Sequence, residues 1–152
     1  MPTISAQQIA QHAYNAGFRG DALTTAVAVA LAESHGDTGI HGDVNLQTGA
    51  WGPSVGLWQI RSLNPGHGTA VEQALRNATA NADPATNARH AYAISRQGTN
   101  FGPWSTYTSG AYRGYLDRAR TAGRQVVSRP VTSGTVTGAT PTSFRVAPRA
   151  LD

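Results

Sequence analysis

The sequence predicts a mainly α-helical domain of the α+β class, compact and built around one buried central helix. Three observations support this prediction. From Ala22 to Ala32 the chain reads ALTTAVAVALA, and a helix that is apolar on almost every side is typically buried. Start and stop signals of further helices lie on both sides of this segment. Residues 36–56 are rich in Gly, Asp, Asn and Thr without helical periodicity, so we expect a loop there with a short β-ribbon near 40–46.

The first helix is predicted over residues 5–16. Ser5 and Gln8 have the S-x-x-Q spacing of a capping box, and Gly17 follows as a stop signal. The central helix is predicted to begin at Asp21 and to run to residue 34, with Gly36 ending it.

The rest of the folded chain alternates turns with short helices. Asp83 and Pro84 form a favourable N-cap and first-turn pair, which marks the start of one helix. The predicted elements, in chain order, are an extended or partly helical segment at 54–60, a turn at 64–66, helices at 69–78 and 83–96, an aromatic loop at 101–107, and a last helix at 111–122 ended by Gly123.

The composition changes after residue 123. Thirteen of the 29 residues in 124–152 are Ser, Thr, Pro or Gly, and no amphipathic period is visible. We therefore divide the chain into a folded domain, 1–123, and a tail, 124–152. The tail is either a linker or a docking peptide for a larger assembly, and both interpretations stay open.

The charge distribution argues against nucleic acid as a partner. The chain contains twelve Arg and no Lys; residues 1–123 carry a net charge of +1 and residues 124–152 one of +3. A nucleic-acid-binding domain normally concentrates positive charge on its folded face. No apolar run approaches the about 18 residues of a membrane span, and no secretory leader is apparent, so we expect no membrane insertion.

Glu33 is the first candidate catalytic residue. On the central helix it shares a face with Ala22, Ala26 and Val29, where desolvation raises the pKa of a carboxyl group. The partial negative charge of a helix C-terminus acts in the same direction. A carboxylic acid that stays protonated near neutral pH suits general-acid cleavage of a glycoside. Taken alone, however, a solvated Glu at a helix end is the simpler interpretation.

The five histidines do not predict a metal site. They are scattered, and none follows the H-x-x-x-H or H-E-x-x-H spacing that brings ligands onto one helix face. The chain also lacks cysteine. We therefore expect neither a metal ion nor another cofactor.

Three motifs in order give Glu33 its context. Glu33-Ser34 ends the apolar helix, Gly56-Leu57-Trp58-Gln59-Ile60 follows the Gly-rich loop, and a third region covers 83–88 and 104–107. This arrangement resembles the lysozyme-like superfamily, and more narrowly the soluble lytic transglycosylase and goose-type lysozyme group with its phage-encoded relatives. Trp58 replaces the usual Met, and the usual Ala-Tyr-Asn motif is not recognisable.

The resemblance implies a peptidoglycan-cleaving enzyme. Glu33 would protonate the β-1,4 glycosidic oxygen between N-acetylmuramic acid and N-acetylglucosamine. The expected substrate-binding residues are Ser34, Ser54, Gln59, Trp104 and Tyr107, of which the last two, on an aromatic Gly-Pro loop, could stack on sugar rings and take over the role of the missing motif.

A second carboxylate is less evident. Asp43 is the candidate, although a solvated loop or Asx-turn acid is the simpler interpretation. In a transglycosylase the substrate's own acetamido group and 6-hydroxyl replace the second carboxylate and the water, and Glu33 acts as acid and then as base. Hydrolysis and transglycosylation both remain open.

The expected setting is the bacterial cell wall. We expect delivery by a phage or phage-like particle, or release of an endolysin through holin-type lysis, with glycan strands as partners and particle proteins bound through residues 124–152. The rival hypothesis is a non-catalytic lysozyme-fold module that has a structural or wall-binding role in a tail-like particle.

Overall fold

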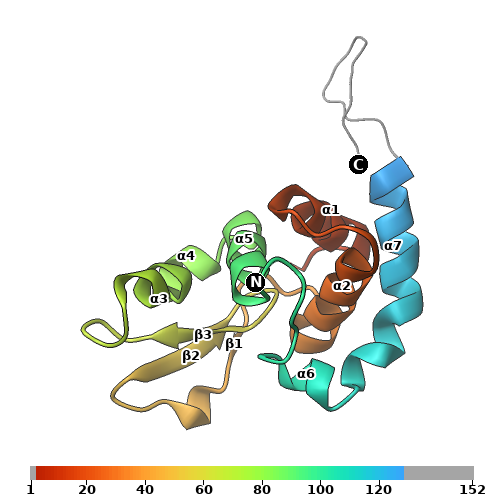
Figure 1. The fold of residues 1–152 in the computed structure, drawn as a ribbon. Coiled ribbons are helices and arrows are strands. Elements are labelled where there is room, and N and C mark those ends of the chain that lie inside the picture. The colour runs from red at the N-terminus through yellow and green to blue at the C-terminus, as the bar shows by residue number, and fades with distance from the viewer. Residues whose placement is uncertain (1–2, 129–152) are drawn as a thin grey trace.

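The computed structural model describes residues 3–128 and shows a mainly helical α+β fold with one small antiparallel sheet (Figure 1). This confirms the predicted fold class. The helices are α1 Ala6–Ala16, α2 Gly20–Ser34, α3 Ala70–Leu75, α4 Ala78–Asn81, α5 Pro84–Ile94, α6 Ser105–Thr108 and α7 Leu116–Ser128; the strands are β1 His41–Gly42, β2 Trp51–Val55 and β3 Ile60–Leu63; two 3₁₀ helices cover Val44–Leu46 and Ala111–Tyr115.

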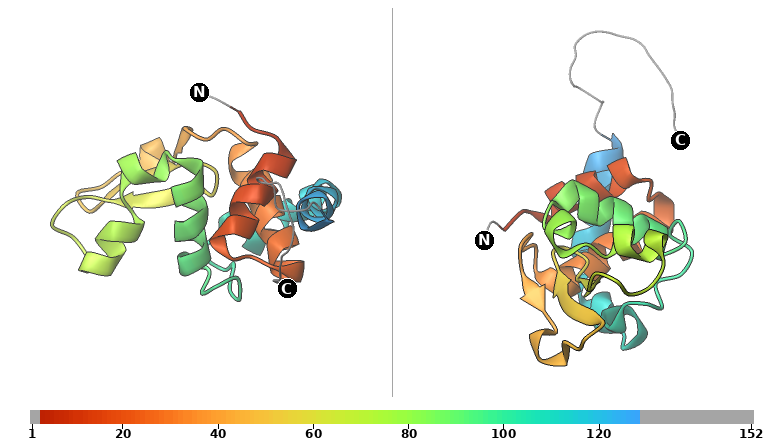
Figure 2. Two further views of the ribbon diagram at one scale, coloured as in Figure 1. Left: turned by 90° about the horizontal axis from the view of Figure 1, so that it is seen from above. Right: turned by 90° about the vertical axis from the view of Figure 1, so that its left-hand side faces the viewer.

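Helix α2 is the centre of the hydrophobic core, as predicted. It contacts α1, α7, α6 and the second 3₁₀ helix, and Figure 2 (left) shows α7 on the outer side of α1 and α2. Every residue from Ala26 to Leu31 is buried. Three of these six are alanines, so neighbouring helices approach the α2 backbone closely, and the helix can position its last turn by packing.

Three of the predicted helix starts are confirmed by their caps, whereas the last predicted helix begins as a 3₁₀ helix at Ala111–Tyr115 and becomes α-helical only from Leu116. Ser5 and Gln8 form a complete capping box at α1, and the Asp83 side chain accepts from the backbone of α5. A second capping box, from Thr69 to Glu72, begins α3. These caps satisfy backbone N–H groups that the first turn leaves without partners.

Two predicted helix boundaries are wrong. Residues 69–78 form two helices, because Asn77 caps a new helix by accepting from the Ala80 N–H. Gly123 does not end the last helix: α7 continues to Ser128 with Gly123 buried against Leu23 of α2. The first five residues of the predicted tail are thus helical, and the rest, 129–152, lie outside the described residues. The aromatic loop at 101–107 also contains the start of α6.

The sheet has the order β1-β2-β3, and both pairs are antiparallel. Ser54 on β2 pairs with Gly42 on β1 and with Arg61 on β3. The ribbon expected near 40–46 is correct only for the two residues of β1, since 44–46 form a 3₁₀ turn and the longer strands lie further along the chain. A Gly-Pro pair at 52–53 obscures β2 in the sequence, because proline cannot donate to a strand ladder.

The fold therefore has two lobes. The helical lobe consists of α1, α2, α6 and α7; the ribbon lobe consists of the sheet and α3, residues 41–76. Helix α5 lies between them (Figures 1 and 2) and contacts α1 on one side and α3 and α4 on the other. Of the helices in residues 3–128, none has the length and apolar character needed to cross a membrane.

Candidate active site

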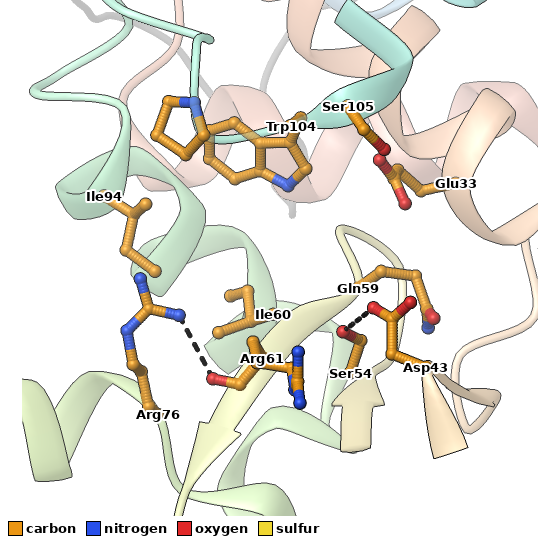
Figure 3. A pocket seen from close by; sticks show the side chains of 11 residues that line it. Glu33, Asp43, Ser54, Gln59, Ile60, Arg61, Arg76, Ile94, Trp104 and Ser105 are labelled. Atoms are coloured by element: carbon orange, nitrogen blue, oxygen red, sulfur yellow. Dashed lines mark hydrogen bonds between the residues drawn. The ribbon is translucent and has the colours of Figure 1, made fainter. Parts of the chain in front are cut away.

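A pocket of about 230 Å³ lies where the two lobes meet (Figure 3). The helical lobe contributes Glu33 from the last turn of α2, together with Trp104 and Ser105 at the start of α6. The remaining lining residues come mainly from the ribbon lobe: Asp43, Ser54, Gln59, Ile60, Arg61 and Arg76, with Ile94 and Pro103 completing the wall.

Glu33 is half-buried at the pocket wall. The Thr106 hydroxyl donates a hydrogen bond to Glu33 Oε2 at 2.9 Å. Burial raises the pKa of the Glu33 carboxyl group above its ordinary value, and the negative charge of Asp43 raises it further, while the hydrogen bonds from Thr106 partly oppose this shift. The pKa direction agrees with the one expected from the sequence.

Ser34 does not line the pocket, in contrast to the substrate contact expected for it. Its side chain is buried, its hydroxyl donates to Ala30 O at 2.9 Å, and its oxygen accepts from the Gly36 N–H at 3.2 Å. Both bonds serve the end of α2, where His35 adopts a left-handed conformation as C-cap. Ser34 therefore fixes the turn that follows Glu33.

The tight turn between β2 and β3 is held by one buried side chain. Asn87 accepts from the Trp58 N–H at 3.0 Å, and its amide donates to Val55 O and Asn81 O, both at 2.8 Å. Gly56 has a φ of +78°, and a Cβ there would lie 2.4 Å from Asn87 Nδ2. The turn thus requires glycine at position 56.

Trp58 belongs to the core rather than to the pocket. The side chain is fully buried, and its indole N–H donates to Ala26 O of α2 at 2.9 Å. This ties the turn of the ribbon lobe to the central helix. Trp58, which stands where the motif usually has Met, is therefore a packing residue.

Gln59 reaches the pocket wall from a left-handed position, with a φ of +45°. Its amide group donates to Ile40 O and to Gly56 O, each at 3.0 Å. These two bonds hold the side chain in one orientation beside the pocket.

Asp43 and Ser54 face the pocket together. The Ser54 hydroxyl donates to Asp43 Oδ2 at 2.5 Å, which fixes the exposed carboxylate against β2. In Figure 3 this pair and Gln59 lie below Glu33, with the pocket opening between them and Trp104. Two carboxyl groups thus belong to one pocket, each with a hydroxyl donor.

The aromatic residues divide into two roles. Trp104 lines the pocket and is only 4% exposed. Its indole N–H donates to Trp58 O at 2.6 Å, which fixes the ring in place. Tyr107 does not line the pocket; its ring stacks on Tyr112 with 4.8 Å between centroids. The side chain that contacts Glu33 is Thr106, the residue that sequence reasoning passed over between the two aromatics.

Arg61 and Arg76 were not predicted as pocket residues. They are separated by a turn and by α3, and no motif connects them in the sequence. In the part of the chain that the structure describes, no group of three or more His, Cys, Asp or Glu side chains is arranged to hold a metal ion.

A helical lobe and a small antiparallel ribbon with an acid between them define a lysozyme-like domain. Residues 10–106 match the lysozyme-like domain family, which is more than half of the chain, and the protein belongs to this family. The matched range includes Glu33, the 56–60 turn and Thr106. No curated protein and no solved structure gives a significant match to the chain. Membership supports a glycosidase-type fold that acts on peptidoglycan.

Proposed function

We propose that the protein cleaves the β-1,4 bond between N-acetylmuramic acid and N-acetylglucosamine, with Glu33 as general acid. The observation that carries this proposal is the half-buried Glu33 in the pocket between the lobes, whose pKa is raised by burial and by the charge of Asp43. A carboxylic acid of this kind can donate its proton to a leaving glycosidic oxygen. Thr106 orients the carboxyl group for that transfer.

The reaction then proceeds with Glu33 as the one reacting carboxyl group. As the glycosidic bond breaks, the electron pair goes to the departing oxygen, which takes the Glu33 proton, and an oxocarbenium-like centre forms on the muramic acid. The substrate's acetamido oxygen stabilises that centre. The muramic acid 6-hydroxyl attacks it and returns a proton to Glu33, which gives a 1,6-anhydro product and consumes no water. Asp43 acts here through its charge, by favouring protonated Glu33.

Replacement of Glu33 tests the catalytic proposal. The Glu33→Gln variant keeps the shape of the side chain but carries no transferable proton, so we expect clearing of purified peptidoglycan to fall by about 10²- to 10⁴-fold. Asp117→Asn is the control, because Asp117 is an exposed carboxylate on α7 that does not line the pocket. Equal clearing by wild type and Glu33→Gln would leave only the rival role, a non-catalytic wall-binding or structural module.

The released muropeptides distinguish the two reaction types. Mass spectrometry should find products lighter by one water than those of a hydrolase. Asp43→Asn should give the same products, and the basic limb of the pH–rate profile should move to lower pH, because one cause of the raised Glu33 pKa is lost. Products with reducing ends that vanish in Asp43→Asn would instead make Asp43 the base that activates water.

Attachment to the wall or to a carrier is a separate proposal. We propose that the Arg-rich segment 124–152, with its net charge of +3, binds anionic wall polymers or the proteins of a phage-like particle that carries the domain. The triple variant of Arg129, Arg145 and Arg149 to Gln should sediment less with purified cell walls at low salt, and high salt should remove the difference. Unchanged sedimentation would exclude the wall as the partner of this segment.

A further inference from the structure

Positive charge lines the same pocket as the two carboxyl groups. Arg61 comes from β3, and Arg76 directly follows α3. Figure 3 shows Arg76 on the side of the pocket opposite Glu33, with Arg61 between Arg76 and the Asp43–Ser54 pair. The pocket thus has an acidic end, where we place bond cleavage, and a basic end to which the proposed mechanism gives no role.

The two guanidinium groups have neutral partners. Arg61 donates to Gly52 O and to Leu46 O, and Arg76 donates to Arg61 O at 3.1 Å. Within residues 3–128 the single ion pair joins Arg120 to Asp117, on the exposed surface of α7. Neither pocket arginine is therefore neutralised by a carboxylate of the described chain.

Arg76 gives the stronger indication of a bound anion, because its side chain is half-buried. Burial lowers the pKa of its guanidinium group, and the nearby Glu72 only partly opposes this. The Glu72 carboxylate is itself committed to the capping box, where it accepts from the Thr69 N–H at 2.8 Å. A partly desolvated cation without a close counter-charge is unfavourable, and a bound anion would offset that cost.

Trp51 orders both guanidinium groups. The Cζ atoms of Arg76 and Arg61 lie 5.5 Å and 6.0 Å from the centroid of its ring, within the range of cation–π attraction. The ring is 36% exposed, so the cluster is open to a ligand. The pre-oriented guanidinium fork of Arg76 suits the planar, two-oxygen geometry of a carboxylate. Arg61 donates through Nε and Nη2 to backbone carbonyls, so it adds its positive charge and the Nη1 group to the subsite.

We propose that Arg61 and Arg76 form a carboxylate-binding subsite for the lactyl branch of the muramic acid residues. The inference rests on the proposed function, since it takes peptidoglycan as the substrate. The sugar rings of that polymer are neutral, and its carboxylates belong to the lactyl branch: a free lactyl carboxylate where the peptide is absent, or the carboxylates of the attached peptide. The basic end of the pocket, across from Glu33, therefore favours one register of the glycan strand. In that register the lactyl branch lies against the two arginines.

Binding measurements in a Glu33→Gln background test the subsite without cleavage. The ligands are peptide-bearing glycan strands, strands stripped by an amidase so that the lactyl carboxylate is free, and neutral β-1,4-linked N-acetylglucosamine oligomers. We expect Arg76→Gln to raise the Kd for carboxylate-bearing strands about tenfold, as for loss of a hydrogen bond to a charged group, and to leave the Kd for the neutral oligomers unchanged. Arg118→Gln, an exposed change on α7, is the matched control and should leave every Kd unchanged.

The pattern across ligands identifies the carboxylate. A loss confined to peptide-bearing strands assigns the subsite to the peptide carboxylates, and a loss confined to the stripped strands assigns it to the free lactyl carboxylate. A loss on both anionic ligands shows that the subsite accepts either carboxylate of this branch. Equal losses on anionic and neutral ligands, or no loss at all, would overturn the proposal. Arg76→Lys keeps the positive charge but not the guanidinium fork, so we expect a Kd between those of the wild type and Arg76→Gln. This second variant keeps the test valid if Arg76→Gln does not fold.

Failure of the two proposals is distinguishable. The catalytic proposal alone would fail if the wild-type chain cleaved no strands but still bound them more tightly than Arg76→Gln does. The subsite proposal alone would fail if the chain cleaved strands and substitution of Arg61 or Arg76 changed neither binding nor cleavage.

Discussion

The helical lobe and the ribbon lobe are held together by different forces. In the helical lobe Ala26 to Leu31 are buried without a break. In the ribbon lobe large apolar side chains stand exposed, including Leu46 at 58%, and side-chain donors hold the backbone instead. Asn64 donates to Thr48 O and Gly49 O, and Arg61 to Gly52 O. The helical lobe is thus ordered by packing. The ribbon lobe joins the core through Leu57, Trp58 and Ile60, whereas its outer loop, residues 43–52, is ordered by polar contacts near water.

The two lobes thus offer different surroundings to the residues of the candidate site. The acid needs desolvation, which the last turn of α2 provides beside the core. Recognition of a polar polymer needs amides, hydroxyls and guanidinium groups, and the ribbon lobe supplies them on short loops. Regions with few buried apolar contacts open locally at low free energy, so we expect the exposed outer loop of the ribbon lobe to open more readily than the last turn of α2.

The same substitution in the two lobes should give the largest contrast. Leu31→Ala removes a side chain that is 1% exposed, and we expect the free energy of unfolding to fall by about 2–5 kcal/mol. Leu46→Ala should change it by less than about 0.5 kcal/mol. Urea denaturation followed by circular dichroism measures both. Similar losses for the two variants would mean that the ribbon lobe is packed as tightly as the core.

The joint between the lobes should be nearly as sensitive. Asn87→Ala leaves the Trp58 N–H, Val55 O and Asn81 O without their buried partner, and we expect a loss of about 3 kcal/mol. The exposed Asn45→Ala should cost less than about 0.5 kcal/mol. If Asn87→Ala were as mild as this control, the contacts of Trp58 and Gln59 would be enough to hold the turn at 56–60.

Sequence reasoning succeeded where signals are local. The alternation of caps and stops predicted α1 and α5, and the apolar run predicted a buried α2 ending at Glu33. It failed at Gly123, because a glycine that ends most helices is here tolerated by close packing on α2. The strands were missed for a similar reason: Gly52 and Pro53 look like a loop, and only pairing with β1 and β3 makes them a strand.

The site was predictable where a motif carries it. Glu33, Ser54, Gln59, Trp104 and Asp43 all line one pocket. Ser34 and Tyr107 do not, since a neighbour in the sequence can face the opposite way on a helix. The hydrogen bond of Thr106 to Glu33 and the pocket positions of Arg61 and Arg76 depend on how distant elements pack together, and no local pattern encodes that tertiary information.

A smaller change should loosen the ribbon lobe alone. Asn64→Ala removes the two hydrogen bonds to Thr48 O and Gly49 O, and we expect a cost of about 1 kcal/mol. Hydrogen exchange should accelerate at the amides of Ala50 and Trp51, which donate to the Thr48 hydroxyl, and stay slow within α2. Equal acceleration in α2 would show that the two lobes open as one cooperative unit.

The smallest change in stability is expected for Thr106→Val, which tests directly what controls the pKa of Glu33. This variant has nearly the same shape and removes the hydroxyl that donates to Glu33 Oε2, so the free energy of unfolding should fall by at most about 1 kcal/mol. The hydrogen bond favours the charged carboxylate, so its loss raises the pKa of Glu33 further. The basic limb of the pH–rate profile should therefore move to higher pH.

Thr108→Val is the control for this prediction, because it lies in the same short helix and its hydroxyl donates only to Ser105 O. Its pH–rate profile should match that of the wild type. Glu33 already has a raised pKa in the folded state, so its contribution to stability is greatest below its unfolded-state pKa and is lost as pH rises through the folded-state pKa. Thr106→Val should move that loss to higher pH as well. A basic limb that stays in place, or moves to lower pH, would mean that the Thr106 hydroxyl does not lower the pKa of Glu33.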